Sequence, residues 1–294
     1  MIRGGIALLL CCVLVGMCGC GGGAYIAKSY ASQADELAVE AQVAFGQGKL
    51  QKGRDLLKMS LNYNRGTDRI VAVAQNLNDL GVLTMSAGDF ITAKRYLEEA
   101  LSLYESSADK AGILSAQLNL ASLEVRGGDE KTALEQLKSI AQEAERSNLP
   151  AIAGSAHNQI AQSLAREKKY EEALSLFQKA LELHYRAKAQ MQAGISLHNL
   201  ADVEIALGLY SQAREHLEKA IAIDKQKELW PSLGEDLFLT GRAWEGLKDS
   251  TQAARLYERA FYVYRFVGNP QSMDAAREAI KRVGGQAPLA DRKD

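Results

Sequence analysis

Small residues recur every 40 positions along nearly the whole chain. One column holds only Ala or Gly, a second column twelve positions later does the same, and a third holds large apolar residues. The three columns are Ala41, Gly81, Ala121, Ala161, Ala201 and Gly241; Gly53, Ala93, Ala133, Ala173, Ala213 and Ala253; and Leu57, Leu97, Leu137, Phe177, Leu217 and Tyr257. Columns that keep their chemistry over six copies predict a helical repeat array. Such arrays work mainly by presenting a long surface to a partner.

Each copy contains two runs of apolar and small residues at helical spacing, separated by a turn. In the second copy Leu77 belongs to the first run, Gly88 to the turn and Leu97 to the second run. Each copy is therefore predicted to be a pair of antiparallel helices, with small residues where the helices approach closely. The turn column holds Gly in four copies but Lys168 and Lys248 in the other two, where we expect a less sharp helix end.

The fourth and fifth copies carry a fuller set of repeat residues. The fifth reads His198-Asn199-Leu200-Ala201, Gly208-Leu209-Tyr210, Ala213, Leu217 and Ala220, and the fourth has Tyr170, Ala173, Phe177 and Ala180. This pattern resembles the tetratricopeptide repeats over residues 34–273. The resemblance implies an all-α, right-handed solenoid of about six helix-turn-helix repeats. Their starts are expected near residues 34, 74, 114, 154, 194 and 234. The period exceeds the family's commonest value of about 34 and is similar to the longer-helix repeats of kinesin light chains.

The end copies are weaker than the central ones. Glu40 stands at a column that is apolar in the next four copies, and Thr240 replaces an apolar residue in the last. Weak ends are expected because a terminal repeat has a neighbour on one side only. Residues 272–283 form an amphipathic pattern that predicts a C-terminal capping helix, and residues 284–294 are predicted to be a disordered polar tail.

The amino terminus has the layout of a secretory signal. All four cysteines lie there, as Cys11, Cys12, Cys18 and Cys20. Arg3 precedes a short apolar run at residues 6–15, which is short for a membrane-spanning helix. Gly19 before Cys20 resembles the bacterial lipoprotein box. The resemblance implies a signal peptide at residues 1–19, lipidation of Cys20 and a tether through residue 33.

Two interpretations of this segment remain open. As a lipoprotein, the chain is expected in the bacterial cell envelope, lipid-anchored to the outer membrane and facing the periplasm, because Gly21 rather than Asp follows Cys20. Met17 departs from the Leu that is usual three residues before the lipidated Cys. In the alternative, the uncharged residues 4–27 are an uncleaved N-terminal membrane anchor.

Charge and motif content give no support for nucleic-acid binding or catalysis. With 35 basic and 36 acidic residues, the net charge of −1 provides no long-range attraction to nucleic acid. The sequence has no phosphate loop, no Gly-x-Ser-x-Gly elbow and no His-Glu-x-x-His motif. The four histidines have no ligand spacing, and we expect His157 to be a packing residue. We therefore expect no enzyme activity, no cofactor and no metal.

The first helix of each pair lines a concave groove in tetratricopeptide folds, so matching columns gives candidate partner-binding residues. They are Asn78, Asp79, Asn119, Arg126, Asn158, Gln159, Gln162, Arg166, His198, Asn199, Asp202 and Arg242. A ladder of amides can donate to and accept from the backbone of an extended peptide, and Arg126 and Arg166 can receive a carboxylate. Alternatively, these are ordinary exposed polar residues, with the Asn side chains joining adjacent repeats by hydrogen bonds.

The leading functional hypothesis is a membrane-anchored extracytoplasmic scaffold lipoprotein that binds extended peptide or protein partners in its groove. Its layout looks like bacterial tetratricopeptide lipoproteins that assist pilus-secretin assembly or recruit cell-wall hydrolases. The alternative is a ligand-sensing or regulatory module, and an enzyme is the weakest hypothesis.

Overall fold

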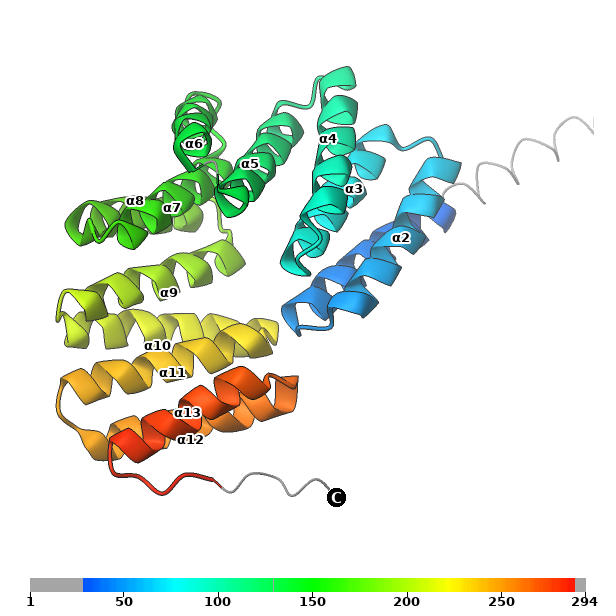
Figure 1. Cartoon of the computed structure of the whole chain (residues 1–294). Coiled ribbons are helices and arrows are strands. Elements are labelled where there is room, and N and C mark those ends of the chain that lie inside the picture. The colour runs from blue at the N-terminus through cyan, green and yellow to red at the C-terminus, as the bar shows by residue number, and fades with distance from the viewer. Residues whose placement is uncertain (1–28, 129, 289–294) are drawn as a thin grey trace, which may run out of the picture.

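The computed structural model describes residues 29–128 and 130–288, and these residues form helices and turns without a β-strand. The first is a helix over residues 29–46. It is followed by α2 (Leu50–Gly66), α3 (Ile70–Ser86), α4 (Phe90–Ser106), α5 (Lys110–Gly127), α6 (Glu130–Arg146), α7 (Pro150–Arg166), α8 (Tyr170–Arg186), α9 (Gln190–Ala206), α10 (Tyr210–Lys227), α11 (Trp230–Gly246), α12 (Ser250–Val267) and α13 (Pro270–Arg282) (Figure 1). The prediction of an all-α solenoid is confirmed.

Each helix packs mainly against its neighbours in sequence. The odd-numbered helices also contact one another, α3 with α5, α5 with α7, α7 with α9 and α9 with α11, whereas the even-numbered helices make no contact of that extent. We call the helix over residues 29–46 and the odd-numbered helices the A helices, and the even-numbered ones the B helices. Because the A helices lie closer together, the array curves with the A helices on its inner side.

The small-residue columns are the places where helices approach. Ala93, Ala133 and Ala173 are fully buried. At Gly81, a Cβ atom would lie only 2.6 Å from the side chain of Leu97, which is itself fully buried. The helices therefore pack at a spacing that leaves no room for a larger side chain in these columns.

The turns differ from the sequence-based expectation in one respect. Lys168 and Lys248 adopt left-handed φ angles of 61° and 63°, the conformation that Gly88 adopts with φ 85°. The backbone N–H of Lys168 donates to the carbonyl of Ala165 at 3.0 Å, as that of Gly88 donates to Met85 at 3.0 Å. The expectation of less sharp helix ends was wrong, because the capping hydrogen bonds outweigh a left-handed penalty of about 1–2 kcal/mol.

The connections between pairs have the same geometry as those within pairs. Their left-handed residues are Asp68, Ala108, Asn148, Lys188, Glu228 and Gly268.

Complete helix pairs begin at residues 70, 110, 150, 190 and 230, which is four residues before the repeat starts expected from the sequence. The difference arises because the sequence columns mark positions inside the helices rather than the caps. Pro150 and Pro270 occupy the first helical position, where no intrahelical N–H is needed.

The two ends of the chain lie partly outside the described residues. The signal peptide, Cys20 and most of the tether fall in residues 1–28, which are among the residues that the structure does not describe. At the other end, Ala287 of the predicted tail packs against a buried cluster that includes Ala253 and Ile280. Within the described part of the chain, no helix combines the length and the apolar character needed to cross a bilayer.

A pair of glycine variants tests this packing. A Cβ at Gly112 would overlap the ring of Tyr104, which is 1% exposed, whereas a Cβ at Gly66 would meet nothing within 4 Å. We expect Gly112→Ala to destabilise the chain by about 1–3 kcal/mol through overpacking. Gly66→Ala should stabilise it by about 0.5–1 kcal/mol through the reduced entropy of the unfolded chain. Urea unfolding followed by circular dichroism measures both, and shifts of equal sign and size would contradict this account.

Candidate partner-binding groove

Three pockets follow one another along the A helices. The N-terminal pocket, of about 460 Å³, and the central pocket, of about 480 Å³, share Gln162 and Arg166. The central pocket and the C-terminal pocket, of about 300 Å³, share Asp202 and Arg242. Because each pocket shares side chains with the next, we treat the three as one continuous groove.

Ten of the twelve candidate residues line this groove. They are Asn119, Arg126, Asn158, Gln159, Gln162, Arg166, His198, Asn199, Asp202 and Arg242. Asn78 and Asp79 line none of the three pockets. Asn78 is buried, and burial raises the pKa of Asp79 to about 6 although Gln75 donates a hydrogen bond to it at 2.9 Å. The candidates of α5, α7, α9 and α11 therefore lie together in the groove, whereas those of α3 lie outside it.

The groove amides also join neighbouring A helices. Asn119 Nδ2 donates to Asn78 Oδ1 at 2.9 Å, and Asn199 Nδ2 donates to Asn158 Oδ1 at 3.3 Å. Gln159 Oε1 accepts from the hydroxyl of Ser122 at 2.7 Å. An amide has two N–H donors and a carbonyl oxygen that can accept twice, so these bonds use only part of its capacity. The amides can therefore join repeats and still offer hydrogen bonds to a bound segment.

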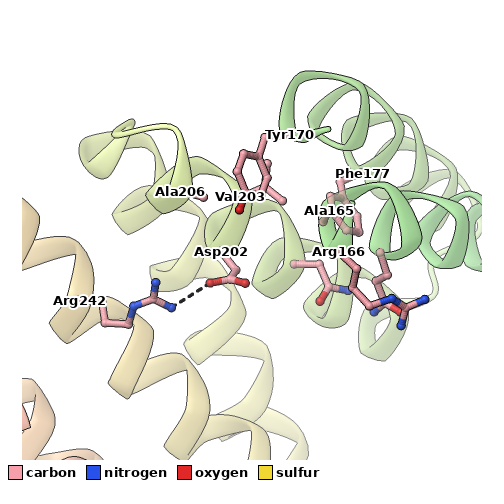
Figure 2. Close-up of a pocket in the computed structure, with 10 residues that line it drawn as sticks. Ala165, Arg166, Tyr170, Phe177, Asp202, Val203, Ala206 and Arg242 are labelled. Atoms are coloured by element: carbon pink, nitrogen blue, oxygen red, sulfur yellow. Dashed lines mark hydrogen bonds and ion pairs between the residues drawn. The ribbon is translucent and has the colours of Figure 1, made fainter. Parts of the chain in front are cut away.

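The arginines of the groove differ in their pairing. Arg166 donates to Glu130 Oε1 and to the hydroxyl of Ser163, both at 2.8 Å, and Arg242 donates to Asp202 Oδ1 at 3.0 Å. In Figure 2 the guanidinium of Arg242 points toward Asp202, whereas that of Arg166 points away from it. Among the described residues, no acidic side chain forms an ion pair with Arg126, which is exposed. Of the two arginines expected to receive a carboxylate, Arg126 is the one without an ion-pair partner among the described residues.

The central pocket is lined by both apolar and polar side chains (Figure 2), and we call its buried apolar part the floor. Phe177 and Val203, which are 1% and 3% exposed, lie on its floor, with the ring of Tyr170 beside them. Gln162, Asn199 and the Asp202–Arg242 pair supply the polar part of its lining. An apolar side chain can bury surface on this floor while the backbone beside it meets the amides.

A buried acidic pair lies beneath the C-terminal pocket. His198 Nδ1 lies 2.6 Å from Asp236 Oδ1, and Asp236 is 2% exposed. Asp224, on α10, is 3% exposed, and its Oδ2 has no hydrogen-bond partner among the residues that the structure describes. Burial raises the pKa of both carboxyl groups, and at Asp236 the hydrogen bond from His198 limits the rise. Burial lowers the pKa of His198, but the hydrogen bond and the charge of Asp236 outweigh it and raise that pKa overall.

Sequence reasoning identified His198 but missed Asp224 and Asp236. The signal that could have found Asp236 is its column, which holds small or amide side chains in the four copies before it. Those are Asn76, Ala116, Ala156 and Ser196, whereas the first copy has the exposed Glu36. A carboxyl group in a column that packs inside the array must find a partner or hold a proton.

The remaining histidines form hydrogen bonds between helices. His157 is 9% exposed and its Nε2 lies 2.6 Å from Glu145 Oε1, in agreement with a packing role. His216 Nδ1 lies 2.8 Å from Glu204 Oε2. His184 Nδ1 lies 2.9 Å from the hydroxyl of Ser196, and burial lowers the pKa of His184 to about 4. In the part of the chain that the structure describes, no three His, Cys, Asp or Glu side chains are grouped so as to hold a metal ion.

The acidic pair predicts a pH dependence of stability. Folding raises the pKa of Asp224 and of His198, so the folded chain holds these protons more tightly than the unfolded chain. The stabilisation is complete below the unfolded pKa values and is lost as the pH rises through the folded ones. The contribution of these groups to the melting temperature should therefore decline between about pH 4 and about pH 8, the unfolded and folded pKa values of Asp224. His184, whose pKa folding lowers to about 4, contributes in the opposite direction below pH 6.5.

Asp224→Asn should flatten this decline, because the amide is neutral at every pH in the range. Asp274→Asn is the matched control, since the side chain of Asp274 is 73% exposed. Thermal melting followed by circular dichroism measures the slope. An unchanged slope in Asp224→Asn would show that the buried pair does not titrate in this range.

Comparison with known proteins identifies the repeat. The tetratricopeptide repeat model matches residues 71–141 and 152–226. No curated protein matches the sequence. Similar solved structures include a Rap protein complexed with competence and sporulation factor, with 14% identity over 86% of this chain and 75% of that chain, and a TM-score of 0.59.

Two further structures are similar over most of the chain. The Rap conjugation gene regulator of plasmid pLS20, in complex with the Phr* peptide, has 12% identity over 84% of this chain and 73% of that one, with a TM-score of 0.62. BtubC (BKLC) from P. vanneervenii has 19% identity, covers 87% and 96% of the two chains and has a TM-score of 0.52. At these identities the similarity shows the fold alone. Together with the family match, it identifies the helical pairs of residues 71–141 and 152–226 as tetratricopeptide repeats.

Proposed function

We propose that the chain is a scaffold that binds an extended segment of a protein or peptide partner in the groove. The observation that carries the proposal is the continuity of the three pockets along α5, α7, α9 and α11, each sharing side chains with the next. Two of the similar Rap structures are complexes, one with competence and sporulation factor and one with the Phr* peptide. Those complexes support a binding role on this fold.

The chemistry of the groove favours a segment in extended conformation. A chain without internal backbone pairing presents N–H and C=O groups along its length, and the amides of Asn119, Gln159 and Asn199 recur at a spacing of one repeat. The apolar floor of the central pocket accepts a side chain between two such amides. Most of the groove cations are already paired, so recognition rests more on backbone hydrogen bonds and burial than on charge.

We further propose that the chain is a lipoprotein anchored to the outer membrane of a bacterial envelope. The support is the short apolar run followed by Gly19-Cys20, together with the absence of cysteine from the repeat body. The residues after Cys20 provide a tether that holds the groove away from the membrane surface. The partner would then be an envelope protein.

Peptide selection tests the groove. The full chain is immobilised and used to select binders from a random peptide library, and the dissociation constants of the selected peptides are measured. Changing Asn119, Gln159 and Asn199 together to Ala should raise these constants about tenfold or more, because each lost amide leaves peptide groups of the ligand unpaired. The matched control changes three exposed B-helix amides, Gln142, Gln178 and Gln212, to Ala.

A second variant separates binding from stability. Arg126 and Gln162 have no hydrogen-bond or ion-pair partner among the described residues, so Arg126→Ala with Gln162→Ala should weaken binding and leave melting unchanged. If both groove variants bind the selected peptides as tightly as the wild type, the groove is not the working surface.

Acyl labelling tests the anchor. Cys20→Ser should abolish incorporation of labelled fatty acid and release the folded chain from the membrane fraction, because the modified thiol is gone. Cys18→Ser is the matched control and should still incorporate the labelled fatty acid and remain in the membrane fraction. Labelled acyl chain on Cys20→Ser would place the modification elsewhere.

A further inference from the structure

One contact joins parts of the array that are far apart in sequence. Gln47 Nε2 donates to Glu228 Oε2 at 2.8 Å, across 181 residues. A Cβ at Gly46 would lie 2.5 Å from Leu229 Cδ2, and one at Gly48 would lie 3.0 Å from Pro231 Cγ. We call this contact, between residues 46–48 and 228–231, the latch. In Figure 1 the turn after the first helix lies beside the α10–α11 connection.

The latch is unusual for a repeat array. In such arrays each repeat contacts only its neighbours, so curvature is normally set by the sum of small rotations between adjacent repeats. Here the first pair touches the connection between the fifth and sixth pairs. Together with the contacts of α2 with α3, and of α3, α5, α7 and α9 in turn, this closes a circuit of contacts. A closed circuit fixes the curvature more firmly than the separate interfaces do.

Gly stands at the centre of the latch, at a position that holds Gly only in the first and the last repeat. The positions equivalent to Gly46 are Ser86, Arg126, Arg166, Ala206 and Gly246. Arg at this position is therefore compatible with the local helix, yet at Gly46 even a Cβ atom would meet Leu229. The absence of a side chain at Gly46 allows the two surfaces to meet.

We propose that the latch sets the curvature of the groove, and that opening it weakens the binding of a partner segment. The inference rests on the proposed function of the groove. All three pockets lie on the A helices between the two sides of the latch or next to them, so a change in curvature alters the spacing of the pockets along one bound segment. If the latch already holds the pockets at the right spacing, no binding free energy is lost in ordering the groove when the partner binds.

The latch is small enough to open. It consists of one exposed side-chain hydrogen bond and the packing of two glycines against Leu229 and Pro231. A net hydrogen bond contributes only about 0.5–1.5 kcal/mol, so both states can be populated and a bound partner can shift the balance between them.

Two kinds of variant open the latch. Gly46→Arg inserts the side chain that α5 and α7 carry at the same position. Gly66→Arg is its matched control, because Gly66 also ends a helix, a Cβ there would meet nothing within 4 Å, and it lines none of the three pockets. Gln47→Glu places a second carboxylate opposite Glu228. The exchange variant, Gln47→Glu with Glu228→Gln, restores an amide–carboxylate pair with the roles reversed.

The readouts are neutron scattering of the full chain in contrast-matched detergent and the dissociation constant of a peptide selected by the wild type. We expect Gly46→Arg and Gln47→Glu to enlarge the radius of gyration and to raise the dissociation constant about fivefold or more. Gly66→Arg should leave the radius and the dissociation constant unchanged, and the exchange variant should restore both quantities. Melting curves show that each variant is folded.

Each contrary result has a distinct meaning. If Gly46→Arg scatters like the wild type, the latch does not set the curvature and the inference is overturned. If the radius grows but the dissociation constant stays the same, the coupling is overturned while the proposed function stands. If the wild-type chain selects no peptide at all, the proposed function fails and the coupling fails with it.

Discussion

The close approach of helices at the Ala and Gly columns is the constraint on which the rest of the structure depends. Ala93, Ala133 and Ala173 leave no space for a larger side chain, so each helix is held against its partner at a short and constant spacing. The A helices of successive pairs also touch, whereas the B helices do not do so to the same extent. This difference bends the array, places the polar columns of the A helices on the inner side and brings the first turn to the α10–α11 connection.

The sequence predicts a contact well when the contact repeats every 40 residues, and poorly when it occurs once in the array. Columns of 40 residues predicted the helix pairs and most groove positions, because residues at equivalent positions occupy equivalent places in an array of equal repeats. Asn119 and Asn199 lie where that spacing puts them. The turns at Lys168 and Lys248 could not be inferred from residue type, because the capping hydrogen bonds decide their conformation.

The features that the sequence did not predict do not recur at the 40-residue spacing. The ion pair of Arg166 with Glu130 joins an A helix to the end of a B helix, and the acidic pair depends on single substitutions in two different columns. The latch lies further still from what a periodic pattern encodes. The two sides of the latch meet only because the rotations from each helix pair to the next add up over four steps, and a small change in each rotation would separate them. Helix propensity and residue periodicity do not determine the total rotation.

The pairing of charges within the groove constrains what the groove can recognise. A partner carboxylate that approached Arg166 or Arg242 would have to displace Glu130 or Asp202, and would gain little by exchanging one exposed ion pair for another. Arg126 has no such competitor in the described chain. Under the proposed function, selectivity along most of the groove then comes from the spacing of the amides and from the apolar floor of the central pocket. If the groove binds a partner as we propose, that spacing follows from the curvature, and the geometry of the whole array, more than any single side chain, determines which segment fits.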